Sequence, residues 1–335
     1  MFFHPAVAPQ GWGGWQQGST YGLSALRQRI TGCLKSYTEN RLMFSPVIAI
    51  AALLTLIPYL VAAFFARSLA KAKLTETFPT SALLFGPALL CIPYVLVAFS
   101  SGMFRWQWCA LYALLPSTIS ILMWQASRID PNRRGNWRDL LVLASLGLAV
   151  DLRWFEHAWP AHLVIFNKIL LLDAGIYGFL ALRKLDGVGF DLRLCLRDAG
   201  IGLREVAFYA PIALAIGLGL GFLHLHTSWP HLAQFAGAFI FTFFFIAVPE
   251  ELFFRGWLQN LLERRIGRYP ALFMTAVLFG LSHWNKRAAH FNWRYVLLAA
   301  LAGIFYGRAW RQERRIGAAA ITHASVDTIW SLWLR

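Results

Sequence analysis

Long apolar runs, separated by short polar or basic stretches, dominate the pattern of this chain. A run of about 20 apolar residues suffices for a helix to cross a bilayer, because each residue adds ~1.5 Å of rise. Residues 139–155 form a shorter run with Asp151 and Arg153 inside it, which fits either a short span or an interfacial helix. The other runs predict membrane helices at 45–66, 81–100, 107–124, 162–182, 206–226, 238–262, 269–284, 295–310 and 316–334.

This pattern predicts an all-α fold, a polytopic transmembrane helical bundle of about nine to ten helices. The first 44 residues lack a continuous apolar core and are rich in polar residues and glycine. Within them, residues 23–35 repeat apolar positions at helical spacing, which fits an amphipathic helix on the membrane or a plain exposed linker.

Composition supports a membrane protein and argues against nucleic-acid binding. The chain is 58% hydrophobic and 14% charged, with a net charge of +15. Its basic residues gather between the apolar runs, where anionic lipid headgroups and membrane topology explain them. The four cysteines show no CxxC spacing, so neither a zinc finger nor a disulfide framework is predicted.

Most of the lysines and arginines lie in five loops. If 139–155 spans the membrane, these loops fall on the same side, and the positive-inside rule makes that side cytoplasmic. The loops are 67–80, 125–138, 183–205, 263–268 and 311–315.

Two carboxylates and an arginine interrupt the apolar run FFIAVPEELFFR at residues 244–255. Charge at the centre of a bilayer costs ~2.5–3.5 kcal/mol per residue, so it persists mainly where it pairs or has a function. Glu251 and Arg255 are four residues apart on one helical face, which favours an ion pair. Glu250 points about 100° away and lacks that partner, as suits a general base. Pro249 predicts a kink. A purely structural ion-pair network is the alternative.

Two further helices carry ionisable residues one helical turn from a second notable residue. Phe279 precedes His283 in FGLSHW, and His323 precedes Asp327 in ITHASVD. Each pair alone is explained by packing or by one buried hydrogen bond. Measured from the basic helix ends at ~1.5 Å per residue, Glu250 lies ~21 Å deep and His283 ~22 Å. Asp327 lies ~18 Å deep and His323 ~12 Å, so the residues predict one polar, water-holding cavity.

The residue types in this predicted cavity suit hydrolysis. A carboxylate beside an imidazole deprotonates water, and a histidine with a second polar group holds a developing oxyanion. No GxSxG supports a serine nucleophile. Two alternatives stay open: Glu250, His283 and His323 also suit zinc with one open position, although HExxH is absent. The same buried charges suit a proton-coupled transporter or a membrane-immunity protein.

Three segments of the chain resemble the motifs of a known family. EELFFR at 250–255 matches EExxxR, FGLSH at 279–283 matches FxxxH, and HASVD at 323–327 matches HxxxN/D. These motifs belong to the CAAX protease and bacteriocin-processing (CPBP, or Abi) family of intramembrane endopeptidases, which includes the prenyl-protein endopeptidase of the endoplasmic reticulum. The resemblance covers about residues 205–335, which are predicted to form a protease core of four to five helices. Before this core the sequence predicts an N-terminal polar or amphipathic segment at 1–44 and N-terminal transmembrane helices at 45–204.

The resemblance implies a glutamate-dependent endopeptidase that needs no metal or other cofactor. Glu250 would activate water with His283, while His323 and Asp327 would stabilise the oxyanion. The supporting residues would be Glu251, Arg255 and Phe279. The prenyl endopeptidases carry Asn where this chain has Asp327. A carboxylate donates a hydrogen bond only when protonated, so Asp327 orients His323 in an alternative interpretation.

The resemblance also implies the partners and the location. The substrate would be a membrane-associated protein or peptide, cleaved in or near the lipid bilayer. The expected location is a bacterial inner membrane, as a multi-pass protein. The additional N-terminal spans are compatible with a member that works beside a protein-sorting system.

Overall fold

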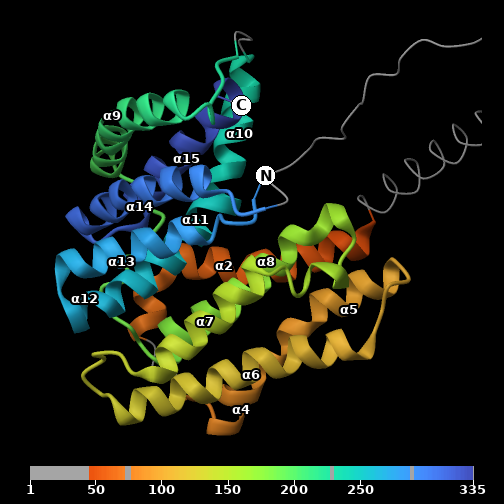
Figure 1. Ribbon diagram of the computed structural model, residues 1–335. Helices are drawn as coiled ribbons and strands as arrows, with labels where there is room; N and C mark the ends of the chain where they lie inside the picture. Colours follow the sequence, from red (N-terminus) through yellow and green to blue (C-terminus); the bar gives the residue numbers. More distant parts are fainter. Residues whose placement is uncertain (1–44, 72–76, 227–229, 287–289, 335) are drawn as a thin grey trace, which may run out of the picture. The chain divides into compact units, whose positions relative to one another are not determined.

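The computed structural model describes residues 45–71, 77–226, 230–286 and 290–334, so the helix predicted within 23–35 lies outside the described residues. Every regular element in these ranges is helical, and the elements join into 10 helices. Six of them are long and apolar enough to cross a membrane. The predicted all-α, multi-pass membrane bundle is therefore confirmed (Figure 1).

Helix α6 is the centre of the first half of the chain, because it packs against α4, α5, α7 and α8. The 3-10 turn η1 links α4 to α5, and the π-helical η4 extends α8. These elements are α2 (Pro46–Lys71), α4 (Thr80–Phe85), η1 (Gly86–Leu90), α5 (Cys91–Ser100), α6 (Trp106–Ile129), α7 (Trp137–Asp151), α8 (Val164–Ile176) and η4 (Tyr177–Leu182).

Helix α14 has the corresponding place in the second half, where it packs against α9, α13 and α15 (Figure 1). A continuous helix from 232 to 266 contains α10, two π-helical stretches η5 and η6, and the short α11 and α12. The bounds are α9 (Leu196–Gly219), α10 (Leu232–Thr242), η5 (Phe243–Ala247), α11 (Val248–Glu251), η6 (Leu252–Gln259), α12 (Asn260–Ile266), α13 (Arg268–Leu281), α14 (Trp293–Glu313) and α15 (Ile316–Trp333).

Large apolar side chains are exposed along several of the long helices. Leu53, Phe99 and Leu114 each expose more than half of their surface, at 58%, 63% and 63%. In water such extended apolar surface would favour aggregation or association, whereas lipid chains cover it without cost. The exposed belt and the six long apolar helices are typical of a multi-pass integral membrane protein.

The helix predicted at 206–226 is displaced towards the N-terminus. Helix α9 runs from Leu196 to Gly219, so the second half of the predicted basic loop 183–205 is helical. Hydropathy missed these turns because they are charged, but their charges have partners in the fold. Asp198 accepts from the Cys195 backbone N–H at 3.0 Å and from Arg315 Nε at 2.7 Å.

Helices were correctly predicted near 139–155, 269–284, 295–310 and 316–334, but none of these is among the six long apolar helices. α7 and α13 have 15 and 14 residues, too few to cross a bilayer alone at ~1.5 Å per residue. α14 carries several charged residues, and α15 is buried over most of its length. α15 therefore meets protein more than lipid.

Four of the five predicted basic loops meet at one end of the helices. Arg264 donates to the Arg133 carbonyl at 2.8 Å and to Asp186 Oδ1 at 2.6 Å, which joins three of them. Arg314, from the fourth, forms an ion pair with Glu263 at 2.6 Å. The arginines of these loops therefore lie close together in the structure.

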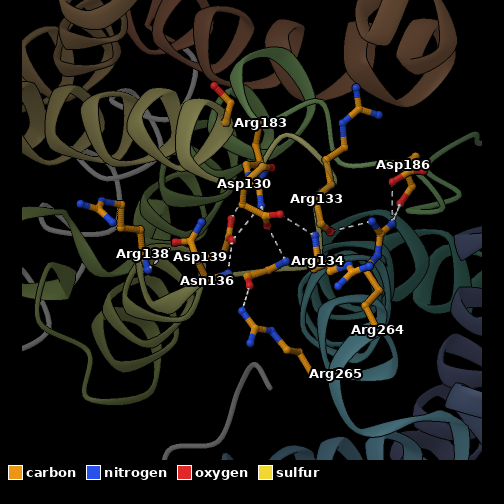
Figure 2. A network of polar contacts seen from close by, with 12 residues as sticks. Asp130, Arg133, Arg134, Asn136, Arg138, Asp139, Arg183, Asp186, Arg264 and Arg265 are labelled. Atoms are coloured by element: carbon orange, nitrogen blue, oxygen red, sulfur yellow. Dashed lines mark hydrogen bonds and ion pairs between the residues drawn. The ribbon is translucent and has the colours of Figure 1, made fainter.

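A buried arginine holds the first half of this end together (Figure 2). The Arg183 side chain is fully buried and donates from Nε to Asp139 Oδ1 at 2.8 Å. Its terminal nitrogens donate to the Asp130 carbonyl at 2.9 Å and to the Asp130 carboxylate at 2.5 Å. Asp139 also accepts from the Asn136 backbone N–H in a capping box at the start of α7. The end of α8 is thereby fixed to α6 and α7.

Candidate active site

The helix that carries the two glutamates continues through Pro249. Ala247, Val248 and Leu252 all keep helical backbone angles, so the proline does not break the helix. Pro249 has no N–H to donate, and π-helical turns on both sides, η5 and η6, accommodate the missing hydrogen bond. Such wider turns are frequent at functional sites, because they change the direction in which the following side chains point.

Glu251 is the acceptor on which the centre of the site depends. Its side chain is fully buried, and its Oε1 lies 3.1 Å from Arg255 Nη1 and 2.8 Å from His323 Nδ1. Arg255 is also fully buried and donates from Nη2 to the Gly303 carbonyl at 2.9 Å. The predicted Glu251–Arg255 pair is thus present, and it extends across helices to α14 and α15.

Aromatic rings enclose this buried pair. The Arg255 guanidinium lies 4.7 Å from the ring centroid of Phe279 and 5.4 Å from that of Tyr306. His323 stacks on Tyr306, with centroids 4.6 Å apart and planes at 16°. The edge of Phe279 meets His323 at 5.6 Å. The rings restrict His323 to one orientation, in which Nδ1 faces Glu251.

The second nitrogen of His323 faces the two remaining carboxylates. His323 Nε2 lies 3.5 Å from Asp327 Oδ2 and 3.9 Å from Glu250 Oε2. The Glu250 side chain is 29% exposed and that of Asp327 is 36% exposed, whereas Glu251 is completely enclosed. Glu250 Oε2 itself is buried and makes no hydrogen bond within the described residues. The two adjacent glutamates therefore have different surroundings, as the helical spacing predicts.

His283 lies in the turn after α13 and is held by its own helix. Its Nδ1 lies 2.8 Å from the Phe279 carbonyl, which only accepts, so in this contact Nδ1 carries the proton. Nε2 of the neutral ring is then a free acceptor. The ring packs against Phe279 and Tyr295, with both centroids 4.9 Å away, and is 6% exposed.

The contacts of Glu250 differ in one respect from the prediction made from the sequence, which paired Glu250 with His283. Glu250 has its nearest ion-pair contact with His323, and no hydrogen bond or ion pair joins it to His283 among the residues described. His283 acts on Glu250 only at longer range. The helical faces of the residues were predictable, but the partner across the helices was not.

Sequence reasoning missed two lysines near Glu250. Lys286, four residues after Ser282 in the turn beyond α13, interacts electrostatically with the Glu250 carboxylate. Lys168 in α8 interacts electrostatically with Lys286 and with Glu250, and so does Asp151 at the end of α7. The available signal was the position of Lys168 inside an apolar run, where an ionisable residue points to a function.

The ligand group of the zinc alternative is not assembled in the described part of the chain, where no three His, Cys, Asp or Glu side chains are grouped to hold a metal ion. His323 Nδ1 is already engaged by Glu251, and His283 Nδ1 by the Phe279 carbonyl. A chelation experiment, described below, tests this alternative directly.

The family comparison matches residues 232–329 to the type II CAAX prenyl endopeptidases described as Rce1-like. No curated protein and no solved structure matches the chain. The matched region runs from α10 into α15 and contains all seven predicted catalytic and supporting residues, from Glu250 to Asp327. The C-terminal region of this chain is therefore an Rce1-like type II CAAX prenyl endopeptidase domain of the CPBP (Abi) family.

Proposed function

We propose that this protein is an intramembrane endopeptidase in which Glu250 activates the water that cleaves a peptide bond. The observation that carries the proposal is the unused Oε2 of Glu250, buried without a hydrogen-bond partner in the described structure and 3.9 Å from His323 Nε2. A buried carboxylate oxygen beside an imidazole is equipped to take a proton from water. The family of the C-terminal domain consists of peptidases, which supports the same reaction.

The reaction begins with a water molecule held by Glu250 and His283. Glu250 takes a proton from this water while the water oxygen attacks the carbonyl carbon of the peptide bond. The neutral His283 ring accepts from the same water through Nε2, because its Nδ1–H donates to the Phe279 carbonyl. The tetrahedral intermediate then collapses, the C–N bond breaks, and Glu250 returns the proton to the leaving amine.

His323 stabilises the negative oxygen of the tetrahedral intermediate. Glu251 binds its Nδ1 at 2.8 Å and Tyr306 stacks on the ring, so Nε2–H of the protonated ring points to the substrate side. Asp327, 3.5 Å from Nε2, orients the same ring and supports its charge. A preorganised donor of this kind typically contributes ~2.7–4 kcal/mol to catalysis.

The substrate is a membrane-associated protein or peptide, which reaches the site from the surrounding bilayer. We propose a bacterial inner membrane as its location, and the additional N-terminal helices are compatible with a partner from a protein-sorting system. Glu251 and Arg255 are positioning residues in this proposal, because they hold His323 and the helix without touching the scissile bond.

The proposal is tested with the full-length protein in lipid nanodiscs and a fluorescence-quenched peptide that ends in a prenylated CAAX sequence. The unprenylated peptide shows whether the prenyl group is required. Glu250→Gln keeps size and hydrogen bonding but cannot act as a base, so cleavage should fall by about 10²–10⁴-fold. Asp173→Asn is the matched control, because Asp173 is another buried carboxyl group, in α8, outside the site.

Three results would contradict this mechanism. Cleavage by Glu250→Gln at the wild-type rate removes the glutamate from the reaction. Loss of cleavage with a chelator, followed by rescue with zinc, favours the zinc alternative instead. A Glu250→Gln protein that still performs its cellular role would rule out the proteolytic account.

A further inference from the structure

A polar pocket of about 400 Å³ lies at the basic end of the helices, and neither Glu250 nor Glu251 lines it. Four arginines and two acidic residues line it, from α12, α13, α14 and the loop after η4: Arg264, Arg268, Arg311, Arg314, Asp186 and Glu263. Four positive and two negative charges leave a surplus of two positive charges, which favours an anionic ligand.

Ion pairs hold three of these arginines in place before any ligand arrives. Glu263, only 7% exposed, forms ion pairs with Arg311 Nε at 2.9 Å and Arg314 Nη2 at 2.6 Å. Arg264 donates to the Asp186 carboxylate and carbonyl, both at 2.6 Å (Figure 2). Burial alone would raise the pKa of Asp186, but Arg264 holds that pKa below its ordinary value, so the carboxylate stays charged at neutral pH.

Arg268 is the arginine of the pocket that pairs with neither Asp186 nor Glu263 in the described structure. It begins α13, is exposed, and makes no hydrogen bond or ion pair in the described part of the chain. Its guanidinium lies 5.5 Å from the ring centroid of Tyr269, its neighbour in sequence. The pocket thus offers one unpaired guanidinium beside three that are already fixed.

The position of the pocket relative to the membrane selects the ligand. The apolar helix from 232 to 266 ends at the pocket, which places the pocket at the level of lipid headgroups. Tyr269 and Phe273, one helical turn apart on α13, expose 72% and 65% of their surface next to Arg268. An aromatic, apolar face directly below a basic pocket fits a molecule with a charged head and hydrocarbon chains.

We propose that this pocket binds the phosphate of an anionic membrane lipid, with Arg268 contacting the phosphate and the acyl chains lying along the Tyr269–Phe273 face of α13. Arginine suits this role because its planar guanidinium donates two parallel hydrogen bonds to phosphate oxygens. The pocket is separate from Glu250 and Glu251, and the proposal does not depend on the proposed proteolytic activity.

The test uses the purified full-length protein in dodecylmaltoside micelles, titrated with dioctanoyl phosphatidylglycerol or dioctanoyl phosphatidylcholine. Native mass spectrometry counts bound lipids, and thermal unfolding reports stabilisation. Wild-type protein should prefer phosphatidylglycerol, and Arg268→Gln should weaken its binding about fivefold, the effect of one basic residue beside an anionic headgroup. Arg268→Lys should restore most of the affinity, because it restores the positive charge.

Arg128→Gln is the matched control, since Arg128 is an exposed arginine in the last turn of α6, outside the pocket. Its lipid binding should match that of the wild type. Equal loss in both glutamine variants would show a diffuse charge effect and overturn the proposal. So would equal binding of the two lipids, or equal stabilisation by inorganic phosphate, which would make the pocket a site for soluble anions. Arg268→Gln must unfold at the wild-type temperature in phosphatidylcholine, which separates lost binding from lost folding.

Discussion

Substitution by alanine should have different effects at the two adjacent glutamates. At Glu251 it should lower the stability of the protein, whereas at Glu250 it should abolish activity and leave stability nearly unchanged. Glu251→Ala removes the only carboxylate that pairs with Arg255 among the described residues, and also the acceptor of His323 Nδ1. Arg255 is fully buried, and in the described structure the Gly303 carbonyl would be its one remaining hydrogen-bond acceptor. Glu250→Ala, by contrast, removes a side chain that is 29% exposed and lies 3.9 Å from its nearest ion-pair partner, His323.

The burial of Arg255 sets the expected difference in free energy of unfolding between the two variants. Breaking a buried ion pair by removing one partner costs ~3–5 kcal/mol, because the other charge stays buried without compensation. At about 1.4 kcal/mol per tenfold change, Glu251→Ala should raise the unfolding equilibrium constant roughly a hundred- to several-thousand-fold. Glu250→Ala breaks no hydrogen bond of the described structure, so its cost should be about 1 kcal/mol or less. Its activity should nevertheless be lost.

Unfolding of both variants in mixed micelles, with increasing sodium dodecyl sulfate, measures this difference through tryptophan fluorescence. The peptide-cleavage assay on the same preparations measures activity. Glu250→Ala should be stable and inactive, whereas Glu251→Ala should be unstable. Equal destabilisation of the two variants, or a cost below about 1 kcal/mol for Glu251→Ala, would refute the proposed division between an active and a supporting glutamate.

Three further substitutions test other parts of the fold by the same unfolding measurement. Arg183→Met should cost ~3–5 kcal/mol, because it leaves the buried Asp139 unpaired, while the exposed Arg134→Gln nearby should cost about 0.5 kcal/mol or less. Asp173→Leu should stabilise the protein by ~1–3 kcal/mol, since both carboxyl oxygens are buried without a hydrogen bond in the described structure; a loss of stability would reveal a role for that carboxyl group. Gly189→Ala should cost at least ~1–2 kcal/mol, because Gly189 has φ +73° and its Cβ would lie 1.8 Å from a backbone carbonyl oxygen; wild-type stability would contradict the conformation.

Hydrophobic pattern predicted the helices well and their ends less well. The spans near 46–65, 80–100 and 106–129 follow directly from apolar runs. The start of α9 does not, because its first turns carry Asp198 and Glu205. Both residues are fully buried in ion pairs, Asp198 with Arg315 and Glu205 with Arg308. Hydropathy scores such residues as loop, since it counts their charge and cannot see their partners.

Contacts within one helix were predictable at the site, and contacts between helices were not. Glu251 and Arg255 meet at 3.1 Å, and His323 and Asp327 at 3.5 Å, because residues four apart share a face. The contact between Glu251 and His323 depends instead on how α15 is rotated against α11, which no local pattern encodes. The roles proposed for these residues stay predictions until the variants are measured.

Phe279 explains how an apolar residue belongs to a motif of charged ones. Its ring lies 4.9 Å from His283, 5.6 Å from His323 and 4.7 Å from the Arg255 guanidinium. Its carbonyl also lies 2.8 Å from His283 Nδ1, which sets the tautomer of that ring. One residue on α13 therefore touches a side chain from each of the helices that carry the charged groups. Since a charge buried in a membrane is stable only with fixed partners, a rigid apolar ring at this point is as necessary to the cluster as the ions themselves.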